Sequence, residues 1–125
     1  MAGAELDVKI EERGDVTVIT LVGPIDSATF DHFKAMVSSY TRAAPARVLI
    51  DCRQLTYINS KGIGLLANWH RKAMIKMGGI VLVGLSPRIT KTLELLGLGK
   101  RLRICEDEAE ALAMLNPPAG DKLEE

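Results

Sequence analysis

The sequence predicts an α/β fold in which helices cover one mixed, largely parallel β-sheet. Two observations lead to this prediction. Short apolar, β-branched segments alternate with longer segments in which apolar residues recur at helical spacing, and Gly and Pro residues separate them. A chain of 125 residues with 47% hydrophobic and 26% charged residues is sufficient for one globular domain with a substantial core. We expect this domain to span residues 1–115, with a polar tail over 116–125.

The chain begins with two predicted strands, over residues 8–10 and 16–22. The second is β-branched and mostly apolar, as expected for a strand inside a sheet. We expect Gly23-Pro24 to end this strand, because both residues disrupt regular pairing. Either Asp26 or Ser27 should then cap the first helix, since their side-chain oxygens accept hydrogen bonds from free backbone N–H groups.

The first helix is predicted from apolar residues that recur at helical spacing. These residues are Phe30, Phe33, Val37 and Tyr40. Pro45 ends this region, and an apolar strand follows over residues 48–50. A short polar loop then leads to Ser60 and to a second helix over residues 62–77, which Gly78-Gly79 terminates.

One apolar stripe of the second helix should face the core. Its members are Ile63, Leu66, Ala67, His70, Met74 and Met77. We interpret His70 as a core or core-edge ring rather than as a catalytic base. Leu65 and Trp69 are four residues apart and lie off this stripe, so an exposed Trp69 is expected to anchor a partner; the alternative is that both side chains pack against a neighbouring loop or helix.

The last part of the chain predicts a strand over residues 80–83 and a helix opened by Ser86-Pro87, with the cap and the first-turn proline in their favoured places. The residues of this helix that should face inward are Ile89, Leu93 and Leu96. A short edge strand over 102–105 and a helix over 107–115 complete the domain.

Composition excludes several classes of function. Sixteen basic and sixteen acidic residues cancel, which argues against direct binding of nucleic acid or of an anionic membrane. No apolar run approaches the roughly 20 residues that span a bilayer, and no signal peptide is evident. Cys52 and Cys105 are expected to be buried free thiols in a reducing cytoplasm. We find no catalytic set, metal-binding spacing or cofactor motif, so an enzyme is not expected.

Polar residues follow two of the predicted strands. Asp26 comes after the second strand and Asn59-Ser60 after the third, and the carboxyl ends of parallel strands meet at one edge of a sheet. Ser60 stands where a helix begins, and the free N–H groups there carry about half a positive charge. Ser60 therefore has two interpretations, as an ordinary helix cap or as an acceptor of phosphate.

Landmarks along most of the chain resemble the STAS domain family, and more narrowly the bacterial anti-sigma factor antagonists. Residues 23–29 resemble the Gly-Glu-Leu-Asp-x-x-Thr turn of that family, and residues 51–66 resemble its segment in which Asp-Ser-Ser/Thr-Gly-Leu-Gly follows an apolar strand. Gly78-Gly79 and the later strand and helix match in order, so the resemblance covers roughly residues 6 to 115. It implies a four- or five-stranded sheet flanked by about four helices.

The resemblance also implies a function. A partner anti-sigma factor, which is also a serine kinase, would bind the unmodified chain and phosphorylate Ser60; phosphorylation would abolish binding, and a phosphatase would restore it. The residues expected to contact partners are Asp26, Asn59, Ser60, Lys61, Gly62, Ile63, Leu65 and Trp69. Asp26 is either only a helix cap or a contact near the nucleotide of the kinase.

Two residues depart from the family pattern. Asn59 stands where the family has aspartate, which keeps capping ability but removes a charge, and Lys61 replaces a second hydroxyl residue, so Ser60 is the single acceptor in the motif. Two alternatives stay open: a non-phosphorylated STAS subunit of a transporter or signalling scaffold, and a small nucleotide-binding protein or weak nucleotide hydrolase that uses a pocket near Asp26 and Ser60. The sequence does not fix the oligomeric state.

Overall fold

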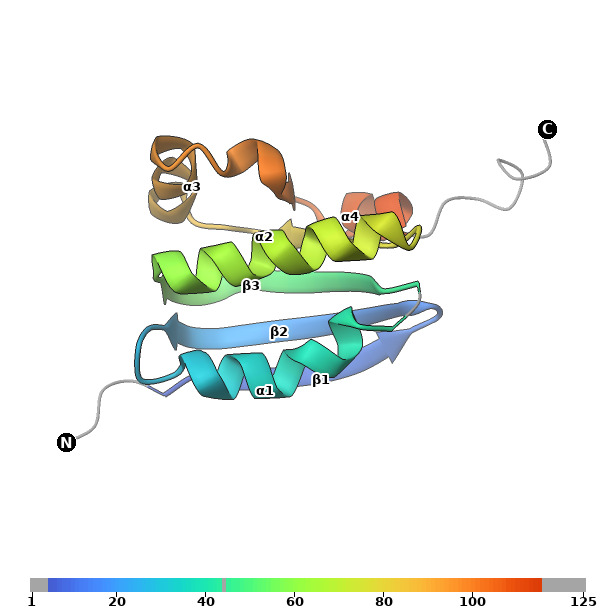
Figure 1. Cartoon of the computed structure of the whole chain (residues 1–125), viewed down its shortest axis with the longest axis horizontal. Coiled ribbons are helices and arrows are strands. Elements are labelled where there is room, and N and C mark those ends of the chain that lie inside the picture. The colour runs from blue at the N-terminus through green and yellow to red at the C-terminus, as the bar shows by residue number, and fades with distance from the viewer. Residues whose placement is uncertain (1–4, 44, 116–125) are drawn as a thin grey trace.

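The computed structural model describes residues 5–43 and 45–115, so the predicted tail over 116–125 lies outside the described residues. It confirms the predicted α/β fold: one five-stranded sheet has the order β1-β2-β3-β4-β5 (Figure 1). The first pair of strands is antiparallel and the other three pairs are parallel, so the sheet is mixed and mostly parallel.

The strands are β1 (Asp7–Arg13), β2 (Val16–Ile25), β3 (Arg47–Ile58), β4 (Gly79–Val83) and β5 (Arg103–Cys105). The helices are α1 (Phe30–Thr41), α2 (Ser60–Ile75), α3 (Pro87–Leu95), the short 3-10 helix η1 (Gly99–Arg101) and α4 (Glu108–Leu115). Each predicted strand and helix is therefore present, with differences at the boundaries. The largest difference is in β3, because residues 51–58, expected to be a polar loop, continue the strand.

Helices cover both faces of the sheet. Figure 1 shows α1 and α2 side by side in front of the strands, and with α3 they bury the larger core, in which Phe33, Ile50 and Leu66 are almost fully inaccessible. On the other face α4 packs on a smaller core. That core contains Val16, Val18, Leu49, Val81, Val83, Cys105, Ala111 and Leu115. The central strands are apolar on both sides because both sides are covered.

The second strand is longer than predicted. The expectation that Gly23-Pro24 ends it is wrong, because β2 continues to Ile25 and pairs there with Ile58 of β3. Gly23 has a φ of 113°, a conformation that glycine adopts without steric cost, and the pairing register shifts between Gly23 and Pro24. This bulge accommodates a proline, which has no N–H group to donate.

The ends of the helices differ from their predicted positions. Met74, Met77 and Leu96 were expected to face the core, and this is wrong: their exposed fractions are 49%, 85% and 50%. Met77 lies beyond the last residue of α2 and has a φ of 69°, while Leu96 is the C-cap of α3, so helical spacing no longer governs either side chain. His70, by contrast, is 6% exposed, in agreement with its interpretation as a core residue.

An ion-pair network joins the sheet to α4. The Arg53 side chain donates to both carboxylate oxygens of Asp51, at 3.0 and 2.9 Å, and to Glu108 at 3.0 Å; Glu108 also contacts Arg13. These hydrogen bonds from Arg53 hold the pKa of Asp51 below its ordinary value. The network therefore connects β1, β3 and α4 through charges at the surface.

We expect the variant D51N to be less stable than the parent protein, by about 0.5 kcal/mol at pH 7, because Arg53 is half-exposed and water screens the pair. Since the folded-state pKa of Asp51 is lowered, its contribution is present above the unfolded-state pKa near 4 and is lost as pH falls through the folded-state pKa. Urea denaturation across this range should show the difference shrinking at low pH. A difference that is constant at every pH would contradict this explanation. The variant R53Q removes the partner of Asp51, so its loss of stability should show the same pH dependence.

Candidate functional site

Ser60 is the exposed first residue of α2, where β3 ends. The helix begins two residues earlier than predicted because Asn59 caps it: the Asn59 Oδ1 atom accepts a hydrogen bond from the Gly62 N–H at 2.8 Å. Asn59 rather than Ser60 is therefore the N-cap of α2, so the interpretation of Ser60 as an ordinary helix cap does not apply. The Ser60 hydroxyl is left at the surface, beside the free N–H groups of the first turn.

The turns after β2 and β3 meet, as predicted for Asp26 and Asn59. The backbone N–H of Asn59 donates to the carbonyl of Ile25 at 2.9 Å, and Asp26 follows directly. The same residue, Asn59, is therefore fixed to β2 through its backbone and to α2 through its side chain. This arrangement fixes the position of Ser60 relative to the rigid sheet.

Asp26 organises the turn before α1 rather than capping the helix itself. The prediction that Asp26 or Ser27 is the cap is wrong, since the N-cap residue is Thr29. The Asp26 Oδ1 atom accepts from the N–H groups of Ala28 and Thr29 at 2.9 and 3.0 Å, and its carbonyl accepts from Phe30. Thr29 also donates its hydroxyl proton to the carbonyl of Pro24. The Asp26 carboxylate is half-buried and remains at the edge of the site.

The residues after Ser60 divide into exposed and buried ones. Lys61 is exposed, and its Nζ atom lies 4.5 Å from the centre of the Phe30 ring, a cation–π contact between the starts of α2 and α1. Gly62 and Ile63 are buried, and a Cβ atom on Gly62 would lie 2.9 Å from the Ile25 side chain. Gly62 and Ile63 therefore support the site from below and offer almost no exposed surface of their own.

Trp69 does not provide an exposed anchor. The expectation that it is exposed is wrong, since its exposed fraction is 7%; its ring lies tilted against Phe33, with the ring centres 5.5 Å apart. Leu65, one turn earlier, is half-buried at the edge of the same core. Trp69 is buried because α1 packs beside α2 and covers the side of α2 that lies outside the predicted apolar stripe.

A groove that no sequence pattern predicted lies beside Ser60. It has a volume of about 550 Å³ and lies between the end of β3, the start of α2 and α3. Its lining residues are Thr56, Tyr57, Ile58, Asn59, Ser60, Ile63, Arg88, Ile89, Thr92 and Leu96. Tyr57 and Leu96 are each about half exposed, at 53% and 50%, and Arg88 supplies a positive charge. The sequence feature that could have indicated this groove is Tyr57, an aromatic residue within a polar stretch.

The described residues bear on the sequence predictions about metals, membranes and cysteines. The structure contains no group of three or more His, Cys, Asp or Glu side chains that could hold a metal ion in residues 5–43 and 45–115. None of the helices in these ranges is long and apolar enough to cross a membrane. Cys52 and Cys105 are buried free thiols, as predicted, and burial raises the pKa of Cys52 to about 12.

The variant N59A should lose about 1 kcal/mol of folding stability, because the Gly62 N–H at the start of α2 would lose its acceptor. In N59D a carboxylate replaces the amide and keeps the acceptor, so its stability should stay close to that of the parent. Chemical denaturation of the three proteins checks this. Equal stability of N59A and the parent would contradict the capping role.

A family model described as the STAS domain matches residues 7–111. The chain is similar to the anti-sigma F factor antagonist of Paenibacillus polymyxa, with 23% identity over 111 residues that cover 88% of this chain and 95% of the relative. It is also similar to the anti-sigma-B factor antagonist of Listeria monocytogenes, with 27% identity over 106 residues that cover 84% and 93%.

Solved structures show the same fold. The crystal structure of an anti-sigma factor antagonist from Mycobacterium paratuberculosis has a TM-score of 0.78 and 22% identity, with 88% of this chain and 93% of that chain covered. The Bacillus cell fate determinant SpoIIAA in its phosphorylated form has a TM-score of 0.64 and 24% identity, with 86% and 98% covered.

Proposed function

The chain belongs to the STAS domain family, and on that premise we propose that it is an anti-sigma factor antagonist switched by phosphorylation of Ser60. In this proposal the unmodified chain binds an anti-sigma factor that is also a serine kinase. Phosphorylation of Ser60 ends the binding, and a phosphatase restores it. The relatives, which are themselves antagonists of anti-sigma factors, support this role.

The observation that carries the proposal is the exposed hydroxyl of Ser60 at the first position of a helix that another residue caps. A kinase can reach this hydroxyl without unfolding the helix. Asp26 and Lys61 border the same edge of the sheet, so they are the first candidates for partner contacts beside Asn59 and Ser60. Leu65 is half-exposed and can extend the partner contact. Gly62, Ile63 and Trp69 are buried, so their role is to support the backbone and side chains of the contact surface.

The fold can accommodate a phosphate on Ser60. The group adds about −1.5 to −2 charges, and the N-terminus of α2 stabilises negative charge by roughly 0.3–1 kcal/mol at an exposed position. Arg88 lines the same groove and can approach the phosphate, whereas Lys61 lies over the Phe30 ring. A partner surface docked over Ser60 would instead have to desolvate this charge. The modification therefore changes binding without requiring a change of fold.

The proposal is tested by isolating the tagged chain from its native cells together with its bound proteins, and by measuring its mass with and without phosphatase treatment. We expect a mass increase of about 80 Da that maps to the peptide containing Ser60 and disappears after phosphatase treatment. The variant S60A should show no such species. ATP is then added to the isolated chain with its bound proteins. If a kinase is bound and the chain stays unmodified, phosphorylation is not the switch, and the alternative of a non-phosphorylated STAS subunit of a transporter or signalling scaffold is favoured.

A further inference from the structure

A second pocket lies on α2, away from Ser60. Its volume is about 490 Å³, within the range of pockets that bind small molecules, and it lies between α2 and the segment that contains η1. The lining residues are Gly64, Ala67, Asn68, His70, Arg71, Met74, Leu98, Lys100 and Arg101. His70 is ten residues from Ser60, which corresponds to about 15 Å along the helix. The pocket is thus separate from the groove at the start of α2.

The charges at this pocket all have one sign. Arg71, Lys100 and Arg101 contribute three cations, and no lining residue carries a carboxylate. The ion pairs in residues 5–43 and 45–115 are formed by Arg13 and Arg53. Within these residues, none of the three cations of the pocket forms an ion pair. Arg71 instead donates to the Asn68 side chain at 2.8 Å. An anion is therefore the complementary ligand.

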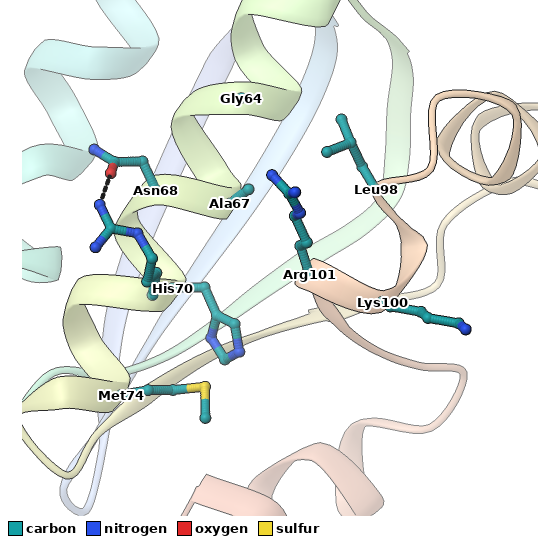
Figure 2. A pocket seen from close by; sticks show the side chains of 9 residues that line it. Gly64, Ala67, Asn68, His70, Met74, Leu98, Lys100 and Arg101 are labelled. Atoms are coloured by element: carbon teal, nitrogen blue, oxygen red, sulfur yellow. Dashed lines mark hydrogen bonds between the residues drawn. The ribbon is translucent and has the colours of Figure 1, made fainter.

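His70 adds a directed hydrogen-bond donor. Its Nδ1 atom accepts from the backbone N–H of Ile80 at 3.1 Å, so the neutral imidazole carries its proton on Nε2. Burial and the nearby positive charge of Arg103 lower the pKa of His70, which favours this neutral form. Both His70 and Arg101 line the pocket; Figure 2 shows the His70 ring on the pocket side of α2, and the Arg101 side chain extending from η1 between Ala67 and Leu98.

The rest of the lining is apolar and open. Ala67, Met74 and Leu98 supply hydrocarbon and thioether surface; Figure 2 shows Ala67 and Leu98 on either side of Arg101, and Met74 beside His70. Gly64 has no side chain, and a Cβ atom built there would meet nothing within 4 Å. One part of the pocket thus suits a charged group, and the other suits a short apolar body.

We propose that this pocket binds a small organic phosphate, in which a phosphate monoester is attached to a short apolar body. A phosphate monoester carries about −1.5 to −2 charges near pH 7, which matches several cations better than a single carboxylate does. Arg101 is the candidate for bidentate contacts with its oxygens, and His70 Nε2 is a further hydrogen-bond donor in the lining of the same pocket. The proposal does not depend on phosphorylation of Ser60.

The probe for this proposal is phenyl phosphate, which combines the two required parts. A calorimetric titration of the full chain should be saturable, with a Kd of about 1 mM or below. Inorganic phosphate, which lacks the apolar body, and phenol, which lacks the charge, should each bind at least tenfold more weakly. Amide shifts in an NMR titration should concentrate on residues 64–74 and 98–101.

The variant R101E should weaken binding of phenyl phosphate at least tenfold. Its matched control is R42E, which makes the same charge reversal at an exposed arginine that does not line this pocket. Circular dichroism checks that both variants keep the fold. Absence of saturable binding to the parent chain would overturn the proposal, and so would equal binding by R101E and R42E, or inorganic phosphate binding as tightly as phenyl phosphate.

Discussion

The variant S60E is expected to bind the anti-sigma factor about a hundredfold more weakly than the parent chain, while keeping the same fold. The carboxylate would lie at the first position of α2, where the helix N-terminus stabilises negative charge, so folding should be unaffected. A partner docked over the same position has to desolvate that charge, and a cost of about 3 kcal/mol corresponds to the hundredfold loss. A binding titration with the co-purified anti-sigma factor measures it.

Two control variants separate the position of the charge from its presence. S60A removes the hydroxyl without adding charge, so it should bind within a few fold of the parent. S39E makes the same substitution at an exposed serine of α1, remote in sequence from the site, and should also bind normally. Binding of S60E as tight as that of the parent, or an equal loss in S39E, would show that Ser60 is not the switch.

Replacing Phe33 by alanine should destabilise the fold by about 3–5 kcal/mol, the range for removing a fully buried aromatic side chain. Phe33 is 0% exposed and packs against Trp69, so the change leaves a cavity between α1 and α2. Trp69 is the only tryptophan in the chain, and its fluorescence during urea denaturation therefore reports on this interface directly.

The neighbouring variant H32A provides the control, because His32 is an exposed residue on the same helix. It should stay within about 0.5 kcal/mol of the parent. If F33A lost less than about 1 kcal/mol, the contact between the two helices would not contribute as the structure indicates. The expected result is a much larger loss of stability in F33A than in H32A.

Much of the fold could be predicted because the pattern is local. Each strand and helix follows from the spacing of apolar residues over one segment, and the cores lie where these residues converge. The meeting of Asp26 and Asn59 was also predictable, since the carboxyl ends of neighbouring parallel strands lie together. The position of Ser60 at the edge of the sheet therefore follows from the sequence pattern.

The boundaries were less predictable because they depend on neighbours in space. β2 passes through Gly23 and Pro24 because β3 pairs with it there and a bulge absorbs the mismatch. Trp69 is buried because α1 lies against it, a contact between segments more than 30 residues apart in the sequence. A helical stripe assigns only one face of α2 and cannot show that a second helix covers its flank.

The sequence by itself determined the order of strands and helices, the polar site after β3 and the serine within it, since these rest on residue type and local spacing. Only the tertiary structure decided which side chains beside Ser60 are exposed, and where the groove and the cationic pocket lie. Those features are formed by segments distant in the chain, and their geometry exists only after the helices pack on the sheet.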